Sequence, residues 1–335
     1  MQKKPSALAL ASAFAAIYVI WGSTYLAIFY ALETLPPLVM AGIRHLVAGV
    51  ILYGWTRMRG ASRPSGRHWR SSALIGGLLL LGGNGGVCWA EQYVPSGVAA
   101  LLITTVPVWM VLLNWLRPGG IRPTLFEVIG LVLGLGGVAV LVGKGDLAGA
   151  SRVDPIGAMV LVGASLSWAF GSIYSRYVTL PDSPFLATAM QMLSGGALLL
   201  IVGLAFGEGS RIAWDQISWR SIAALGYLVF LGSLVAFTAY VWLLRVSTPA
   251  RVSTYAFVNP AVAVLLGCLV AHEVLTGRMI VASIITITGV ALITLSKGKR
   301  RQPEPGGTRI ERTLSENGVP HSGQRAVAGE SPCSE

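Results

Sequence analysis

Ten apolar segments follow one another along this chain, and each is about as long as a helix must be to cross a lipid bilayer. They lie near residues 10–31, 37–56, 71–90, 96–116, 124–142, 156–176, 185–206, 220–243, 251–271 and 278–296. A helix of roughly 17 to 25 apolar residues spans the ~30 Å hydrocarbon core. Of the 335 residues, 54% are hydrophobic and 12% are charged, which gives poor support to any water-soluble class. The sequence therefore predicts an all-α integral membrane protein with ten transmembrane helices.

The formal net charge of +11 follows from lysines and arginines that gather in alternate loops. One side of the predicted membrane receives Lys3, Lys4, Arg57, Arg59, Arg63, Arg67, Arg70, Arg117, Arg122, Arg176, Arg245, Arg251, Lys297, Lys299, Arg300 and Arg301. The other side receives only Lys144, Arg152, Arg211, Arg220 and Arg278. Because positive loops stay in the cytoplasm, we expect a multi-pass protein of the bacterial inner (plasma) membrane with both termini cytoplasmic. This distribution records topology and argues against nucleic acid as a partner.

The two halves of the chain repeat one pattern. The pairs that match at a separation of about 150 residues are Gly22 with Gly171, Pro37 with Pro184, Gly49 with Gly196, Pro107 with Pro260, and Gly137 with Gly289. The repeats cover residues 10–142 and 156–296, five crossings each. Since five is odd, the second repeat enters the membrane from the opposite side. Two inverted five-helix repeats, related by a pseudo-two-fold axis in the membrane plane, are typical of carriers that work by alternating access.

Polar and aromatic side chains recur at corresponding depths in these repeats, and we expect them to line a cavity between the halves. The candidates are Trp21, Ser23, Thr24, Tyr25, Arg44, Asn84, Trp89, Glu91, Trp168, Ser172, Tyr174, Gln191, Tyr240, Tyr255 and Asn259. The matched prolines Pro107 and Pro260 are expected to break their helices, and interrupted helices at corresponding positions point to a transporter's binding site. The aromatic residues also fit an ordinary interfacial belt.

Arg44 is the charged residue whose position in the membrane is hardest to explain. Inserting an arginine into a membrane helix costs roughly 2.5 to 3.5 kcal/mol, so its side chain is usually paired or faces a cavity. It either holds a substrate carboxylate or serves as a structural partner for Glu91 or for helix-end carbonyls. Its repeat mate, Gln191, is neutral. Glu91 itself is expected to be a solvated carboxylate at a helix end, with proton exchange as the alternative. His45 is expected to form a hydrogen bond between helices, with proton relay as the alternative.

The remaining features indicate scaffold or boundary roles. Cys88, Cys268 and Cys333 are far apart, so neither a disulfide nor a metal site is expected. The two helices that end the repeats lack polar residues in their second halves and are predicted to be peripheral. Residues 297–335 are rich in Pro, Gly, Ser and charge and are predicted to form a disordered cytoplasmic tail. The basic start resembles a signal peptide, but the apolar run continues to Tyr30, so we expect this helix to be retained.

Four stretches carry a family resemblance. They are YVIWGSTYLAIFYALETLPPLVMAGIRHLVAG, GGNGGVCWAEQYVPSGVAALL, SLSWAFGSIYSRYVTLP and TYAFVNPAVAVLLG. Over residues 10–296 the chain resembles the EamA-type branch of the drug/metabolite transporter superfamily, and within it the YedA-like inner-membrane exporters. The resemblance implies helices 1–4 and 6–9 around a central cavity, helices 5 and 10 outside, and efflux of small metabolites, such as amino acid export, without ATP. An acidic residue often follows helix 9 in such proteins, and Glu273 stands there as a boundary feature.

The function favoured by these features is that of a secondary transporter, with a small solute and the lipid bilayer as partners and a homodimer left open. No catalytic residue and no cofactor are expected, because the chain has no GxxxxGK[ST] phosphate loop and no GxSG-type nucleophile motif. The alternatives are a channel or scaffold, and, with less support, an intramembrane enzyme.

Overall fold

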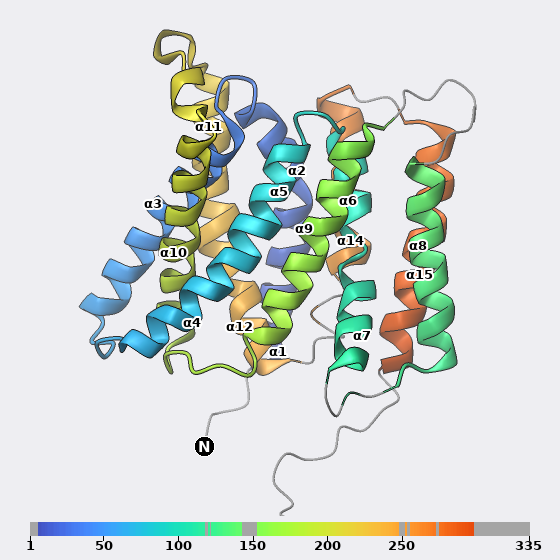
Figure 1. Cartoon of the computed structure of the whole chain (residues 1–335), viewed down its shortest axis with the longest axis horizontal. Coiled ribbons are helices and arrows are strands. Elements are labelled where there is room, and N and C mark those ends of the chain that lie inside the picture. The colour runs from blue at the N-terminus through green and yellow to red at the C-terminus, as the bar shows by residue number, and fades with distance from the viewer. Residues whose placement is uncertain are drawn as a thin grey trace, which may run out of the picture. The chain divides into compact units, whose positions relative to one another are not determined.

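The computed structural model describes residues 6–117, 120, 122–142, 153–247, 252, 255–272 and 275–297. The chain divides into two units, residues 1–299 and 300–335, and the second unit lies outside the described residues. Glu273, Cys333 and almost all of the predicted tail lie outside them as well. Every regular element in the described part is a helix, so the predicted all-α class is confirmed (Figure 1).

The first repeat makes five crossings. They are crossing 1, α1 (Ala7–Ala15), η1 (Ala16–Ile20) and α2 (Trp21–Ala31); crossing 2, α3 (Pro37–Met58); crossing 3, α4 (Gly66–Gly76), η2 (Gly77–Gly85) and α5 (Gly86–Ala90); crossing 4, α6 (Ser96–Ile103) and α7 (Val106–Leu116); and crossing 5, α8 (Leu125–Val142).

The second repeat makes the other five. They are crossing 6, α9 (Pro155–Tyr174); crossing 7, α10 (Pro184–Ala205); crossing 8, α11 (Trp219–Tyr227), η5 (Leu228–Phe237) and α12 (Thr238–Val246); crossing 9, α14 (Tyr255–Val270); and crossing 10, α15 (Gly277–Lys297). The short helices η3 (Glu208–Arg211) and η4 (Trp214–Gln216) lie in the connection between crossings 7 and 8. Seven crossings are long and apolar enough to span a membrane, and shorter apolar helices within α8, α14 and α15 supply the other three. The predicted ten-helix arrangement holds.

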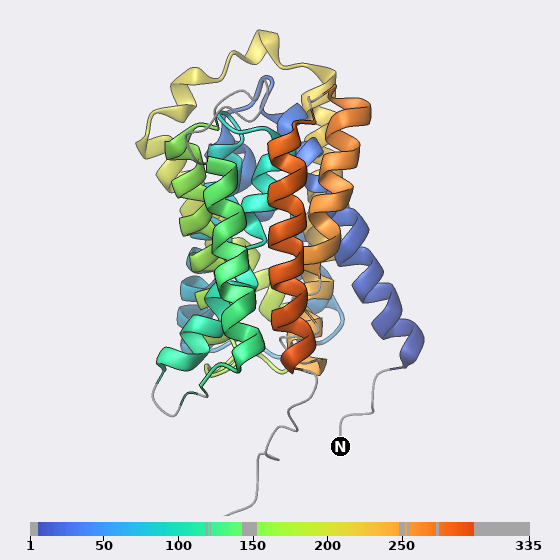
Figure 2. The same cartoon turned by 90° about the vertical axis from the view of Figure 1, so that its right-hand side faces the viewer.

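The two ends of the bundle differ in charge. We call the end that holds the start of α1 and the finish of α15 the basic end, since the arginine-containing segment 57–70 lies there (Figure 1). The other end, which holds the turn between α2 and α3, is called the hairpin end. Crossing 5 and crossing 10 run side by side at one edge of the bundle (Figure 2), which confirms their expected place outside the central helices.

Glycines let the paired helices of the two repeats approach closely. A Cβ added to Gly196 on α10 would lie 2.8 Å from the backbone nitrogen of Leu46 on α3. One added to Gly49 on α3 would lie 2.9 Å from the backbone nitrogen of Leu193 on α10. Small residues at helix contacts allow this backbone approach in membranes. The repeat-matched glycines therefore join crossings 2 and 7.

The two matched prolines lie in different local structures. Crossing 4 is interrupted at Thr104 and Thr105, and Pro107 follows as the second residue of α7. The hydroxyl of Thr105 hydrogen-bonds to that of Ser165 on α9 at 2.6 Å. In crossing 9, α14 runs through Pro260 without interruption, contrary to the expected break. Pro260 is the sixth residue of that helix, so the missing N–H removes a single bond near its beginning and the rest of the helix continues.

Contacts between the repeats fasten their helices together at the hairpin end. Pro36 occupies the N-cap position of α3 and has no side-chain acceptor, so the first amides of this helix need a partner from elsewhere. The buried carboxylate of Glu208 supplies it: Oε2 accepts from the backbone N–H of Leu38 at 2.9 Å and of Val39 at 2.8 Å. Arg220 adds an ion pair to Glu33 at 3.4 Å. The α2–α3 hairpin is thus fastened to the connection between crossings 7 and 8.

Candidate functional site

Three crossings contain π-helical segments, and each segment borders the same region of the bundle. Trp21 directly follows η1, Asn84 lies in η2, and Phe237 ends η5. A π-helical turn widens the backbone ladder and re-aims the side chains beside it, and such turns are frequent at functional sites. Local irregularity therefore directs polar and aromatic side chains of crossings 1, 3 and 8 into the centre.

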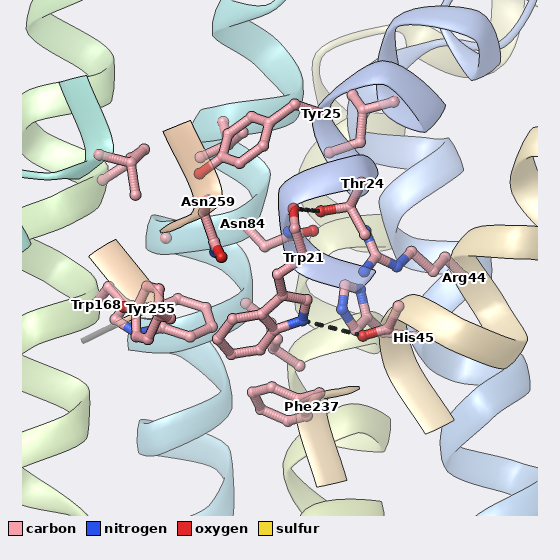
Figure 3. A pocket seen from close by; sticks show the side chains of 17 residues that line it. Trp21, Thr24, Tyr25, Arg44, His45, Asn84, Trp168, Phe237, Tyr255 and Asn259 are labelled. Atoms are coloured by element: carbon pink, nitrogen blue, oxygen red, sulfur yellow. Dashed lines mark hydrogen bonds between the residues drawn. The ribbon is translucent and has the colours of Figure 1, made fainter. Parts of the chain in front are cut away.

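These side chains enclose a space that we call the central cavity. Its lining consists of Trp21, Thr24, Tyr25, Ile28, Arg44, His45, Leu80, Gly83, Asn84, Val87, Ile103, Ala164, Trp168, Gly232, Phe237, Tyr255 and Asn259. Seven crossings from both repeats contribute. In Figure 3, Arg44 and His45 lie on one side of Trp21, and Trp168 and Tyr255 lie on the other. The space measures ≈ 70 Å³, enough for a few water molecules but far below the roughly 300–1,000 Å³ of a small-molecule site.

Arg44 is the charged group of the central cavity. Its side chain is only 3% exposed, and Nε donates to the Ser233 hydroxyl at 2.8 Å. The guanidinium lies against Gly232, where an added Cβ would meet Nη2 at 2.8 Å. Nη1 is buried and has no hydrogen-bond partner among the described residues. A buried guanidinium with an unsatisfied N–H group is costly unless something else accepts that bond.

Two titratable neighbours modify this environment. Glu91, which is 7% exposed, interacts electrostatically with Arg44. Glu91 is therefore not the solvated carboxylate that the sequence suggested, because it caps the end of α5 inside the bundle. His45 hydrogen-bonds to the carbonyl of Ala41 on its own helix at 2.8 Å, not between helices as expected. A carbonyl only accepts, so Nδ1 is the protonated nitrogen.

Aromatic rings pack below Trp21 at the floor of the cavity. The Trp21 ring lies 5.6 Å from that of Trp168, 5.0 Å from that of Tyr240 and 5.4 Å from that of Tyr255. Trp21 Nε1 also donates to the carbonyl of Gly232 at 3.3 Å. Such ring pairs stabilise by ~0.5–1.5 kcal/mol beyond their burial. The cluster fixes Trp21 between the two repeats.

Eight of the expected residues line the central cavity, namely Trp21, Thr24, Tyr25, Arg44, Asn84, Trp168, Tyr255 and Asn259. Asn259 holds its place on α14 by donating through Nδ2 to the carbonyls of Tyr18 at 3.1 Å and Ile17 at 3.2 Å, which leaves Oδ1 as an acceptor.

The structure places the other expected residues outside this lining. Ser23 hydrogen-bonds to the Tyr227 hydroxyl at 2.6 Å. Ser172 hydrogen-bonds to the Tyr240 hydroxyl at 2.7 Å. Each of the two matched serine hydroxyls is therefore paired with a tyrosine of crossing 8. Tyr240 itself is fully buried beneath the cavity. Trp89 packs on Tyr93, and Tyr174 is partly buried among apolar residues. Gln191 lines a different cavity, together with Leu79 of crossing 3 and Leu244 of crossing 8.

Sequence reasoning missed the residues of crossing 8 that position Arg44. Gly232 and Ser233 form a Gly-Ser pair inside an apolar segment, as Gly22-Ser23 and Gly171-Ser172 do. This recurrence was the available signal. Phe237, a further cavity residue, lies in an apolar run that gives no sign of its role.

A family model for the EamA-like transporter family matches residues 7–143 and 155–295. The chain is a member of the EamA-like transporter family. Its two matches to the family model cover both repeats and end before the C-terminal segment. The chain is therefore a multi-pass membrane transporter by family.

Individual EamA relatives are similar over most of the chain. The "Uncharacterized inner membrane transporter YedA" of Escherichia coli (strain K12) is 41% identical over 291 residues, which cover 87% of this chain and 92% of the relative. The "Uncharacterized transporter YvbV" of Bacillus subtilis (strain 168) is 28% identical over 294 residues, covering 85% and 91%. A solved crystal structure with 20% identity matches with a TM-score of 0.62, covers 87% of this chain and 99% of the other, and supports the fold alone.

Proposed function

We propose that this EamA-family protein is a secondary transporter that exports small amphipathic solutes, such as amino acids, across a bacterial inner membrane by alternating access. The observation that carries the proposal concerns Arg44. Its Nη1 is buried, and no described residue accepts a hydrogen bond from it. A solute carboxylate in the central cavity would accept that bond and offset the charge.

The structural alternative for Arg44 explains only part of its surroundings. Ser233 satisfies Nε, and Glu91 contributes an electrostatic interaction. A purely structural arginine would have its guanidinium fully hydrogen-bonded, since an incomplete buried network is destabilising. The unsatisfied Nη1 in a cavity wall therefore favours binding of an anionic group.

The rest of the lining suits a solute with a cationic or apolar part. Trp21 and Trp168 contribute aromatic rings to the lining, and such rings attract an ammonium group and also accept apolar surface. Asn259 offers an amide oxygen as an acceptor for N–H groups. An anchor for a carboxylate on one side and acceptors with aromatic faces on the other fit the chemistry of an amino acid.

The arrangement of the two ends supports a carrier over a channel. At the hairpin end the two repeats are fastened together by Glu208 and by the Arg220–Glu33 ion pair. Since the central cavity is contracted in this conformation, solute entry requires helices to shift. A channel would need a continuous water-filled path, whereas a carrier opens one side at a time. The excess of basic loops favours a cytoplasmic location for the basic end.

Counterflow in proteoliposomes tests the proposal. Vesicles are loaded with each of the twenty amino acids and with a panel of sugars, and entry of the labelled compound is followed with and without a pH gradient. We expect saturable exchange of carboxylate-bearing solutes, a loss of at least tenfold in Arg44→Gln, and partial retention in Arg44→Lys, which keeps the charge but not the planar fork.

Arg63→Gln provides the matched control, because it makes the same change in charge on an exposed loop. It should leave exchange unaltered. Unchanged exchange in a correctly folded Arg44→Gln protein would remove Arg44 from the site. Linear, non-saturating flux would favour a channel, and no exchange of any tested compound would overturn the amino acid assignment.

A further inference from the structure

A second cavity lies at the basic end of the bundle, between crossings 3, 6, 7 and 8. We call it the vestibule; it measures ≈ 400 Å³. Its lining consists of Leu79, Ser175, Arg176, Val178, Leu180, Pro181, Asp182, Gln191, Val241, Leu244 and Arg245. Unlike the central cavity, it is large enough for a small solute in the conformation described.

The inner wall of the vestibule contains a buried amide oxygen that lacks a hydrogen-bond donor. Gln191 is 1% exposed, yet its Oε1 has no hydrogen-bond partner among the residues that the structure describes. At the mouth, Arg176 and Asp182 are exposed and bring charges of both signs. Arg245 fixes that rim by donating to the carbonyls of Pro181 at 3.0 Å and Asp182 at 2.8 Å. The wall therefore offers a buried acceptor behind a charged entrance.

A thin layer of side chains separates the vestibule from the central cavity. On α9, Trp168 lines the central cavity and Ser175 lines the vestibule, with Ser172 between them. On crossing 8, Phe237 lines the central cavity and Leu244 lines the vestibule, with Tyr240 between them. Residues three or four apart share a helix face and lie about 5–6 Å apart along it. The separation is therefore about one side chain thick on both helices.

Tyr240 is the centre of this layer. Its hydroxyl hydrogen-bonds to Ser172 Oγ at 2.7 Å and accepts from Trp168 Nε1 at 3.0 Å. Its ring packs between those of Trp21 and Tyr255. We call Tyr240, Trp168 and Ser172 the partition. A rotation of the Tyr240 side chain would break both of these hydrogen bonds.

The repeat symmetry gives an independent reason to treat the vestibule and the central cavity as two parts of one solute path. Arg44 and Gln191 occupy corresponding positions, 147 residues apart, and line the central cavity and the vestibule respectively. A two-fold axis in the membrane plane exchanges the two ends of the bundle. The two polar residues therefore lie on opposite sides of the partition, one facing each half of a path through the protein.

We propose that the vestibule is a second binding site for the transported solute, in which Gln191 Oε1 accepts a hydrogen bond from an ammonium or amide N–H group, and that Tyr240 is the gate through which the solute reaches Arg44. This inference rests on the proposed transport function. The solute class it names is a small polar molecule with an N–H donor at one end and an anionic group at the other. The donor binds first in the vestibule, and the anionic group binds in the central cavity.

The gate can be tested without knowing the solute. In a cysteine-free background (Cys88→Ala, Cys268→Ala, Cys333→Ala), Ser175→Cys reports on the vestibule and Thr24→Cys on the central cavity. The probe is 2-(trimethylammonium)ethyl methanethiosulfonate, applied from the basic end in inverted membrane vesicles. We expect Ser175→Cys to react at least 100-fold faster than Thr24→Cys. Adding Tyr240→Ala should speed the Thr24→Cys reaction at least tenfold and leave the Ser175→Cys rate unchanged.

Two further variants keep the gate falsifiable. Tyr240→Phe retains the ring but loses both hydrogen bonds, and should give an intermediate rate. Tyr177→Ala removes an exposed tyrosine at the same end and should change neither rate. Equal reactivity of the two cysteines in the parent, or an unchanged Thr24→Cys rate in folded Tyr240 variants, would overturn the gate.

The binding site is tested by protection of Ser175→Cys, with each of the twenty amino acids as the added probe. Protection by at least one amino acid that is lost in Gln191→Leu and kept in Arg44→Gln supports a vestibule site distinct from the central one. Protection by none overturns vestibule binding. Because the gate is measured without solute, a failure of the amino acid assignment in counterflow remains distinguishable from a failure of the gate.

Discussion

Glu208 closes the hairpin end, and its removal should open that end. The carboxylate is 3% exposed and accepts two backbone N–H bonds at the start of α3. Glu208→Ala leaves both amides unsatisfied in the closed state. When the hairpin end opens, water can satisfy them, so the substitution destabilises the closed conformation more than the open one.

The size of the effect follows from these two bonds. A hydrogen bond to a charged group contributes about 1.5–3 kcal/mol, so two contribute at most about 3–6 kcal/mol. Even the lower figure shifts a conformational equilibrium by about 100-fold, since each 1.4 kcal/mol is a factor of ten. Glu208→Gln keeps an acceptor oxygen without the charge and should produce about half the free-energy change.

The assay is the reaction of Thr24→Cys with the same impermeant reagent applied from the hairpin end, in right-side-out vesicles. We expect about a 100-fold faster reaction in Glu208→Ala. Glu127→Ala is the matched control: Glu127 is also a buried carboxylate at a helix start, where it accepts from the Thr124 amide at 2.6 Å, but it serves the peripheral α8. It should lower stability without changing the Thr24→Cys rate. Unchanged labelling in a folded Glu208→Ala protein would refute the closure argument.

Three smaller predictions follow from other contacts. Gly196→Leu should lower the free energy of unfolding by about 1–3 kcal/mol, because it overpacks α3 against α10. In the control Gly163→Leu, the added Cβ would meet open space, so Tm should be nearly unchanged. Equal Tm values for the two variants would contradict the close approach of α3 and α10. Ser233→Ala leaves Arg44 Nε without its hydrogen-bond acceptor and should lower the free energy of unfolding by about 1–3 kcal/mol. Thermal unfolding of the purified protein measures this loss. An unchanged stability would show that Ser233 does not hold the guanidinium. Arg220→Ala should change hairpin-end labelling less than fivefold, because its ion pair is largely exposed; a larger change would make this pair, and not Glu208, the main closure.

The fold was predictable from the sequence because the lipid bilayer restricts the length and the composition of the helices that cross it. Apolar length set the crossings, and the odd number of crossings per repeat set the inversion. The glycines matched between repeats, such as Gly49 and Gly196, do pack their helices together. These features depend on local composition and spacing, which a single sequence displays.

The site was harder to predict, because depth in the membrane does not say which way a helix faces. Gln191 and Arg44 occupy corresponding positions but line different cavities. Ser23 and Ser172 recur with the same glycine neighbour, yet each is occupied by a tyrosine of crossing 8. The π-helical turns before Trp21 and around Asn84 rotate the residues that follow. No regular helical period in the sequence predicts that rotation.

One asymmetry between the repeats explains why the two ends differ in this conformation. The helix α10 begins after Ser183, whose hydroxyl accepts from the Leu186 amide at 3.3 Å, so its N-terminus is capped within its own repeat. The matching helix α3 begins after Pro36, which has no acceptor, and depends on Glu208 from the other repeat. Closing the hairpin end therefore satisfies backbone amides that opening it would leave to water. The first amides of α10 at the basic end need no partner from the opposite repeat, which favours a bundle that rests closed at the hairpin end with its vestibule open at the basic end.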